Sequence, residues 1–307
     1  MKLNGWDWVS TFSLDKINQK LSGTFNTTHV FSIQNSISSM SLTFDGVQMS
    51  GDGSQKYTQL QLTVKEGVLT TKNTKVEIPL NNISPIVKVS LSFFNFNGAM
   101  NYGINIQSND DVTVVDPDSS NTITNSTYLA IIKGLLKDLF LQERETLKTI
   151  FLSIMLPGKN GISAFSPTDY TYAAITLSNG QQFISVFVAT QNQDIKGLST
   201  TLDTSLLSGS GEYLFIDCRE SGFYPLAPIG MVGCATEESN EKQLVMDLYI
   251  VNTSHLDFIR TIKFNRDDYR QDIFEQMAKL SDVRMGTTYL RHTQRGAEDG
   301  TVFFKWA

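Results

Sequence analysis

The sequence is poor in the residues that most often carry catalysis or bind metal ions. Its 307 residues include three histidines and two cysteines. The histidines, His29, His255 and His292, are far apart in the chain, and none has the spacing of a metal ligand. A Gly-x-Ser-x-Gly elbow, a phosphate-binding loop and a dinucleotide fingerprint are also absent. These absences predict a protein with no catalytic residues, no metal site and no cofactor.

Positive charge, long apolar runs and disulfide-forming cysteines are scarce as well. Lys and Arg total 25 against 31 Asp and Glu, and the net charge of −6 argues against a nucleic-acid partner. Apolar stretches are interrupted well before the roughly 18 residues of a membrane-spanning helix, so no transmembrane segment is expected. Cys218 and Cys234 lack the paired spacing of a zinc site, and we expect reduced thiols rather than a disulfide. Because Met1 to Ser13 hold two tryptophans and an aspartate, we expect cytoplasmic synthesis without a Sec signal peptide.

One polar segment has part of a calcium-loop pattern. Asp116, Asp118 and Ser120 occupy the first, third and fifth positions of such a loop. Asn121 replaces the glycine of position six, and Thr127 stands where the bidentate glutamate would be. The pattern therefore favours a polar turn over a calcium site.

Composition and alternation predict a mostly β protein. Ser, Thr and Asn make up 80 of the 307 residues, a usage that favours strands and hydrogen-bonded turns over helix interiors. Apolar residues alternate along several stretches, as in Val87, Val89, Leu91 and Phe93. Short turn signals such as Asn97-Gly98 separate these stretches, which indicates antiparallel strands joined by tight turns.

A helical pattern interrupts the strands from about 127 to 156. Apolar residues recur there at three and four positions, and Pro157-Gly158 follows. Thirty residues would make a helix of about 45 Å, and a curved antiparallel sheet could supply the apolar trough that such a helix needs. Shorter packing helices are expected at Ser13 to Leu21 and at Asp267 to Leu280. The whole chain, 1–307, is interpreted as one elongated domain, with a subdivision at 157–161 as the alternative.

Two strings resemble a known family. They are Asn4-Gly5-Trp6-Asp7 and, after the expected long helix, Phe165-Ser166-Pro167-Thr168-Asp169-Tyr170-Thr171-Tyr172-Ala173. Together they are similar to the accessory proteins of clostridial botulinum-type toxin gene clusters, the OrfX and forty-seven-kilodalton group, whose relatives accompany insecticidal toxins in other bacteria. Ser166 stands where that family commonly has lysine. The resemblance implies a TULIP (tubular lipid-binding) fold, in which a highly curved antiparallel sheet wraps a long amphipathic helix.

The same resemblance implies lipid binding without catalysis. Candidate ligands are a bound lipid or fatty acid, or an anionic phospholipid, and candidate partners are sister toxin-cluster proteins released with the toxin. In a groove between helix and sheet, acyl chains would meet Ile132, Leu136, Leu139, Phe140, Ile150 and Phe151. Helical spacing alone favours the simpler interpretation, in which these side chains fill the core.

A second candidate surface is the string Gly222 to Met231, which is apolar but contains two prolines. It is interpreted either as a partner or membrane docking surface or as a buried crossing over one end of the fold. Its docking candidates, together with the two N-terminal tryptophans, are Trp6, Trp8, Phe223, Tyr224, Leu226 and Ile229. Because the chain is acidic overall, membrane attachment would need apolar anchors or a local basic cluster.

The sequence therefore predicts a bacterial TULIP-like accessory protein that binds lipid or a lipid-bearing surface. The alternative is a protein–protein scaffold, with the groove filled by side chains, that assembles with sister proteins of a toxin cluster. The two differ in what copurifies, because a lipid carrier brings apolar ligand from its host and a scaffold does not.

Overall fold

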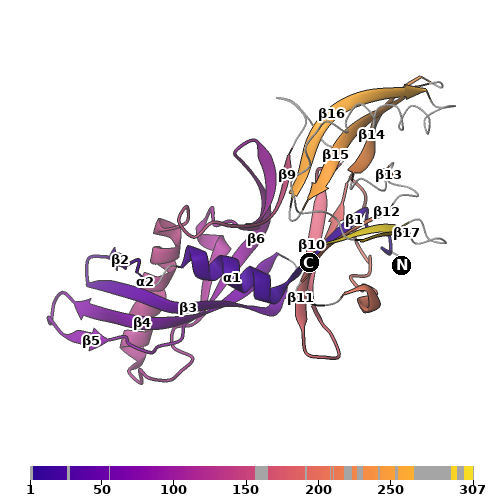
Figure 1. The fold of residues 1–307 in the computed structure, drawn as a ribbon. Helices are drawn as coiled ribbons and strands as arrows, with labels where there is room; N and C mark the ends of the chain where they lie inside the picture. Colours follow the sequence, from indigo (N-terminus) through magenta and orange to yellow (C-terminus); the bar gives the residue numbers. More distant parts are fainter. Residues whose placement is uncertain are drawn as a thin grey trace. The chain divides into compact units, whose positions relative to one another are not determined.

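The chain is mostly β in the computed structural model (Figure 1). The structure describes residues 3–25, 28–54, 56–155, 165–190, 192–207, 209, 211–217, 223–226, 231–240, 243–252, 255–265, 292–295 and 301–306. Of these residues, side chains are described up to residue 216, except at 51–54, 155 and 206. Two α-helices occur in this part of the chain, and neither is long and apolar enough to cross a membrane.

The chain divides into two compact units. Unit 1 comprises Met1–Ser13, Phe94–Asn101 and Leu152–Ala307. Unit 2 comprises Leu14–Phe93 and Tyr102–Phe151. A division into compact units does not decide whether the chain folds as one domain, so the single domain stays a prediction.

Unit 1 contains an antiparallel sheet of six strands, in the order β10-β11-β1-β12-β18-β17. The strands are β1 (Trp8–Ser13), β10 (Asp169–Thr176), β11 (Gln182–Ala189), β12 (Glu212–Asp217), β17 (His292–Arg295) and β18 (Thr301–Trp306). All six residues of β1 are buried, because this strand pairs with β11 on one side and with β12 on the other. Apolar side chains of β1, β11 and β12 form a core with Leu3, Trp6 and Leu207.

A second group of strands in unit 1 includes the proline-containing string. The order is β13 (Phe223–Leu226), β14 (Met231–Asn240), β15 (Gln243–Asn252) and β16 (His255–Asn265), all antiparallel. β13 lies at the end of its sheet, a position that tolerates Pro225 because an edge strand needs fewer hydrogen-bond donors. Ile229, Cys218 and the helix expected at Asp267 to Leu280 lie outside the described residues.

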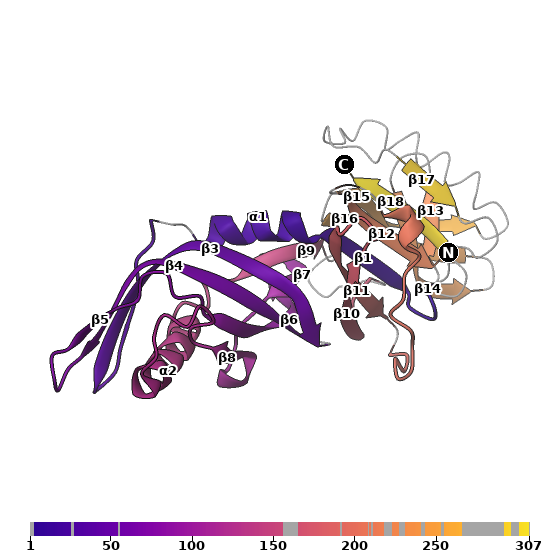
Figure 2. The ribbon, with the colours of Figure 1, turned by 90° about the horizontal axis from the view of Figure 1, so that it is seen from below.

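Unit 2 is built on long antiparallel strands. Its strands are β2 (Phe31–Gln34), β3 (Ser38–Ser54), β4 (Tyr57–Thr71) and β6 (Ile86–Phe96), with β5 (Glu77–Pro79) beside β4 and β8 (Val112–Asp116) beside β6. β3 and β4 have 17 and 15 residues and are visibly curved (Figure 2). Two bulges interrupt their register near Phe44, where extra residues bend the strand. The antiparallel, mostly β part of the fold prediction is therefore confirmed.

Two helices pack in unit 2. α1 (Leu14–Thr24) confirms the expected first helix, and it buries Leu14, Ile17 and Leu21. Asn18 fixes this helix to β3, because its side-chain oxygen accepts a hydrogen bond of 2.7 Å from the backbone N–H of Met49. Asn125 caps the N-terminus of α2 (Ser126–Gln142), because its side chain accepts hydrogen bonds from the backbone N–H groups of Thr127 and Tyr128.

The prediction of one helix over 127–156 is wrong in its second half. α2 ends at Gln142, and after a turn the chain continues as strand β9 (Thr149–Met155) beside β7 (Ala99–Ile104). The apolar spacing was misleading because Phe151, Leu152, Ser153 and Ile154 are all buried. In a strand buried on both faces nearly every residue is apolar, so apolar residues also recur at intervals of three and four, as they do in an amphipathic helix.

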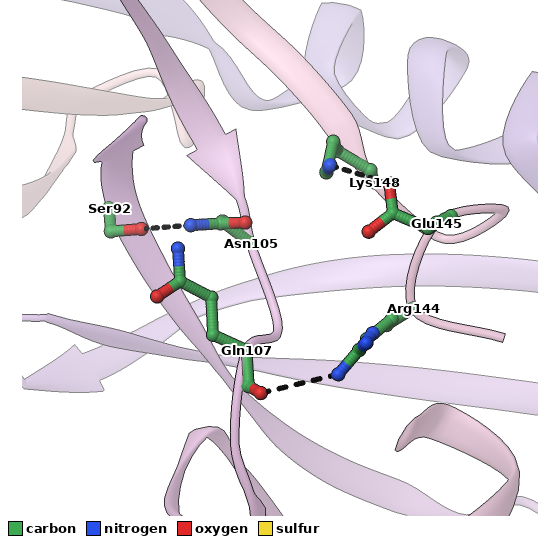
Figure 3. Close-up of polar contacts among 6 residues, drawn as sticks. All are labelled: Ser92, Asn105, Gln107, Arg144, Glu145 and Lys148. Atoms are coloured by element: carbon green, nitrogen blue, oxygen red, sulfur yellow. Dashed lines mark hydrogen bonds and ion pairs between the residues drawn. The ribbon is translucent and has the colours of Figure 1, made fainter. Parts of the chain in front are cut away.

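Polar contacts hold the turn that replaces the expected helix (Figure 3). The Arg144 guanidinium donates a hydrogen bond of 3.4 Å to the backbone oxygen of Gln107. Lys148 and Glu145 form an ion pair at 2.7 Å, and this contact lowers the pKa of the exposed Glu145 carboxyl. The charged segment that the sequence places in mid-helix therefore works as a turn anchored to the loop after β7.

A short capped turn at Asn109–Asp111 gives a prediction on pH. One Asp111 carboxylate oxygen accepts hydrogen bonds from the backbone N–H of Gln107 at 3.0 Å and of Ser108 at 2.7 Å. Partial burial raises the pKa of Asp111, but these hydrogen bonds outweigh it and hold the pKa below its ordinary value. A lowered folded-state pKa stabilises the fold above the unfolded pKa and loses that effect as pH falls.

We therefore expect Asp111→Asn to cost about 1 kcal/mol of unfolding free energy at pH 7. The difference from wild type should shrink as pH falls below about 4, where the carboxyl is protonated in the unfolded chain. Urea titrations of both proteins between pH 7 and pH 3 measure this. A cost that stays constant over the range would contradict a role for the charged carboxylate.

Candidate functional site

The two sequence strings that carry the resemblance meet in unit 1. In the first string, Asn4 and Gly5 have positive φ values of 54° and 93°. The Trp6 N–H donates to the Leu3 carbonyl at 3.1 Å, so a tight turn leads into β1. Asparagine and glycine tolerate this backbone better than other residues, which explains their presence here.

Asp7 and Thr168 connect both strings to the end of β11. One Asp7 carboxylate oxygen accepts from the Thr190 backbone N–H at 2.6 Å and from its hydroxyl at 2.8 Å. In the second string, the Thr168 N–H donates to the Ala189 carbonyl at 2.9 Å. The ring of Phe165 lies 6.3 Å from that of Trp8, in an edge-on arrangement. The two strings therefore join parts of one sheet that are more than 150 residues apart in the sequence.

Trp6 and Trp8, two of the docking candidates, lie in the core of unit 1. Their exposed fractions are 1% and 0%. The Trp6 indole N–H donates to the Ser199 carbonyl at 2.9 Å. A docking role for either side chain would require this core to open. Phe223, Tyr224 and Leu226 belong to edge strand β13, and docking through them stays a prediction.

The groove candidates lie inside unit 2, on two different elements. Ile132, Leu136, Leu139 and Phe140 are on the buried face of α2 and at most 1% exposed. Phe151 and the half-buried Ile150 come from β9 rather than from the helix. The Phe140 ring lies 6.2 Å from Phe25, which in turn contacts Phe31 and Phe44. These side chains fill the interior, and a lipid groove among them stays a prediction.

The partial calcium pattern forms a polar turn before α2. Asp118 is 3% exposed, and its carboxylate accepts from the Ile123 N–H at 2.7 Å and from the Ser120 hydroxyl. The Ser84 N–H donates to it at 3.4 Å. These donors occupy the carboxylate. Among the described residues, no group of three His, Cys, Asp or Glu could hold a metal ion.

A hollow of about 510 Å³ lies on one face of the sheet in unit 2, and sequence reasoning missed it. Neighbouring residues on three strands supply it, because Ser32 pairs with Ser41, which pairs with Val68. The next row is Gln34, Ser39 and Thr70. The lining residues are uncharged: Ser32, Ile33, Gln34, Ser39, Met40, Ser41, Val68, Thr70 and Gln142.

Gln142, the last residue of α2, borders this hollow and donates from its side chain to the Ser32 carbonyl at 3.2 Å. Hydroxyl and carboxamide groups can bind a polar ligand through hydrogen bonds, but they supply no acid or base for catalysis. The sequence did contain one signal of this polar face. Ser39 and Ser41 alternate along β3 with Ser38, Met40 and Leu42, which are buried. That signal identifies a polar face but not a hollow.

Comparisons with known proteins support the expected resemblance. No family model matches the chain. Protein P47 of Clostridium botulinum (strain Kyoto / Type A2) is 24% identical over 228 residues, which cover 69% of this chain and 52% of that protein. The chain thus spans about half the length of this curated relative.

Solved P47 structures share the fold. P47 from Clostridium botulinum A2 aligns with a TM-score of 0.59 and 18% identity, over 81% of this chain and 67% of that one. P47 of Clostridium botulinum E1 aligns with a TM-score of 0.62 and 14% identity, over 99% of both chains. The resemblance to the forty-seven-kilodalton group is therefore confirmed.

Proposed function

We propose that this relative of the P47 proteins is a non-catalytic accessory protein of a bacterial toxin gene cluster that binds lipid. The likeness to P47 of Clostridium botulinum supports the association with toxin clusters. The TULIP fold implied by the resemblance is part of the proposal. The curved antiparallel sheet of unit 2, with an apolar helix against it, supports this assignment.

The observation that carries the lipid proposal is the seam between α2 and its neighbouring strands. The helix buries an unbroken apolar stripe, and the aromatic side chains of Phe25, Phe31 and Phe44 line the adjoining interior. An acyl chain is apolar like these side chains, so it could replace their mutual contacts if α2 moved from the sheet. The strand β2 beside α2 is only four residues long, which makes this side of the unit easy to open.

The alternative is a protein–protein scaffold, and one observation favours it. Five of the six groove candidates are almost completely buried, so the seam is filled by side chains in this conformation. A filled seam needs no ligand, and such a protein would act through its surface.

Native mass spectrometry of the purified protein, followed by organic extraction, tests the proposal. We expect one lipid or fatty acid per chain in wild type and little in Leu136→Phe, because a larger side chain occupies the seam. Overpacking costs about 1–3 kcal/mol, so the melting temperature of the variant must be measured as well. Lys133→Ala, at an exposed position of the same helix, is the matched control and should retain lipid.

A wild-type mass that stays unliganded after incubation with mixed lipids would contradict lipid binding in the seam. The scaffold would then be the better explanation, and pull-downs with the proteins of neighbouring toxin-cluster genes would test it.

A further inference from the structure

Two turns lie next to each other at one end of unit 2, and together they form what we call the apex, residues 35–37 and 72–76. The Lys72 N–H donates to the Ile37 carbonyl at 2.8 Å, which joins the turn between β2 and β3 to the end of β4. The Thr71 N–H donates to the Val76 carbonyl at 3.0 Å, which closes the turn between β4 and β5. Figure 2 shows the β4–β5 turn at the end of the long strands.

The apex exposes apolar side chains. Ile37 is 51% exposed and Val76 is 40% exposed. The other large apolar side chains that are similarly exposed among the described residues are Val30, Phe96 and Val115, none of which belongs to the apex. Single exposed apolar residues are ordinary, but a hydrogen-bonded pair of turns that presents two of them is a candidate contact surface.

The apex is also positively charged in an acidic protein. It contains Lys72 and Lys75, and the exposed Glu77 directly follows it, so the apex and this neighbour together carry one net positive charge, whereas the whole chain has a net charge of −6. The Lys72 ammonium donates to the Asn35 carbonyl at 2.6 Å and to the Gln34 side-chain oxygen at 3.2 Å. Both acceptors are neutral, so they orient this ammonium without neutralising its charge.

The polar hollow adjoins the apex through Gln34. This side chain lines the hollow and also accepts the hydrogen bond from Lys72. Ser39 and Thr70 are its neighbours across the strands, and both line the hollow. The Lys72 ammonium therefore lies beside hydroxyl and carboxamide groups that can bind the oxygen atoms of a headgroup.

We propose that the apex docks on the surface of an anionic phospholipid bilayer. Ile37 and Val76 enter the interface, Lys72 and Lys75 lie at the lipid phosphates, and one headgroup occupies the hollow. The inference rests on the proposed lipid-binding function and gives it a point of contact with the membrane. Burial of apolar side chains and attraction of basic side chains to anionic lipids both contribute to interfacial attachment. A stable protein interface needs roughly 20–30 residues on each side, far more than the apex offers.

Co-sedimentation with vesicles tests the inference on the full chain. The vesicles contain phosphatidylcholine alone or phosphatidylcholine with about 30% phosphatidylserine, the composition that gives an anionic surface. We expect wild type to sediment with the anionic vesicles and not with the neutral ones. Lys72→Gln with Lys75→Gln should weaken binding about 30-fold, since each lysine near an anionic surface contributes to attraction. Ile37→Ser with Val76→Ser should weaken it by about tenfold or more.

Matched controls test whether a loss of vesicle binding is specific to the apex or follows from any loss of charge or of exposed apolar side chains. Lys65→Gln with Lys133→Gln removes two exposed lysines elsewhere and changes the net charge equally. Val30→Ser with Val115→Ser removes two valines that are 56% and 47% exposed. Both controls should bind vesicles like wild type, and all variants should keep the wild-type melting temperature because the substituted side chains are exposed.

The outcomes distinguish this inference from the proposed function. If wild type carries extracted lipid but does not sediment with anionic vesicles, the apex inference is wrong and lipid binding in the seam stands. Apex variants that bind vesicles as wild type does would also overturn the inference. If wild type ignores vesicles but self-associates through Ile37 and Val76, the apex is a protein interface instead. Loss of vesicle binding in the apex variants, with extracted lipid unchanged, would support both proposals.

Discussion

Gly103→Ala is expected to destabilise unit 2 by more than about 3 kcal/mol or to prevent its folding. Gly103 lies in β7, where β9 passes so closely that an added Cβ would be 1.9 Å from the Thr149 carbonyl oxygen. The neighbour is backbone rather than a flexible side chain, so the two strands would have to separate. β9 carries the buried Phe151 and also contacts α1, since the Thr24 and Thr149 hydroxyls are 3.3 Å apart.

Hydrogen–deuterium exchange with urea denaturation measures this effect by region. Peptides of β7, β9 and α1 should lose protection in Gly103→Ala, whereas β1 and β11 of unit 1 should lose less. Gly134→Ala is the control, because this exposed glycine in α2 has no atom within 4 Å of an added Cβ. It should raise stability by up to about 1 kcal/mol, the difference in helix propensity. Similar effects of the two substitutions would contradict the close approach of β7 and β9.

Trp6→Ala is expected to cost unit 1 about 3–5 kcal/mol, the range for deleting a large buried aromatic side chain. The Trp6 ring packs 5.7 Å from that of Phe187, and its N–H donates to the Ser199 carbonyl. Removing the ring leaves a cavity in the core and an unpaired carbonyl at its edge. Trp6→Phe should cost less than Trp6→Ala, because it restores most of the apolar contact but not the hydrogen bond.

Urea denaturation of the Trp6 variants, followed by circular dichroism, provides the measurement. Phe96→Ala is a suitable comparison, since Phe96 is 41% exposed and should cost less than about 1 kcal/mol. If Trp6→Ala keeps wild-type stability but loses binding to vesicles or partner proteins, Trp6 has no stabilising role in the core. Trp6 would then be the docking residue that the sequence suggested.

Much of the fold was predictable because strand periodicity reports directly on burial. Val87, Val89 and Leu91 alternate in the sequence, and all three are buried on β6. The expected helix over 127–156 was correct only as far as Gln142, where α2 ends. After the exposed turn that follows, both faces of β9 are buried from Phe151 to Ile154, and periodicity cannot separate a helix from such a strand. The length of the segment did not reveal the end of the helix either, since the apolar spacing resumes after the turn.

The candidate site was less predictable than the fold. The apolar stripe of α2 was visible as spacing, but its burial depends on partners such as Phe25 that are more than 100 residues away in sequence. The hollow depends on strand register, because Ser32, Ser41 and Val68 become neighbours only once β2, β3 and β4 are paired. The apex likewise requires the contact between Ile37 and Lys72. Single-sequence patterns contain no information on register between distant strands.

The central position of β1 has a consequence for synthesis on the ribosome. This strand is synthesised before its partners β11 and β12, at Gln182–Ala189 and Glu212–Asp217. At about 5–20 residues per second, β1 waits on the order of ten seconds for them. Every residue of unit 2 emerges during that interval. The nascent chain must therefore keep an unpaired apolar strand from mispairing while the segment that follows it can already fold.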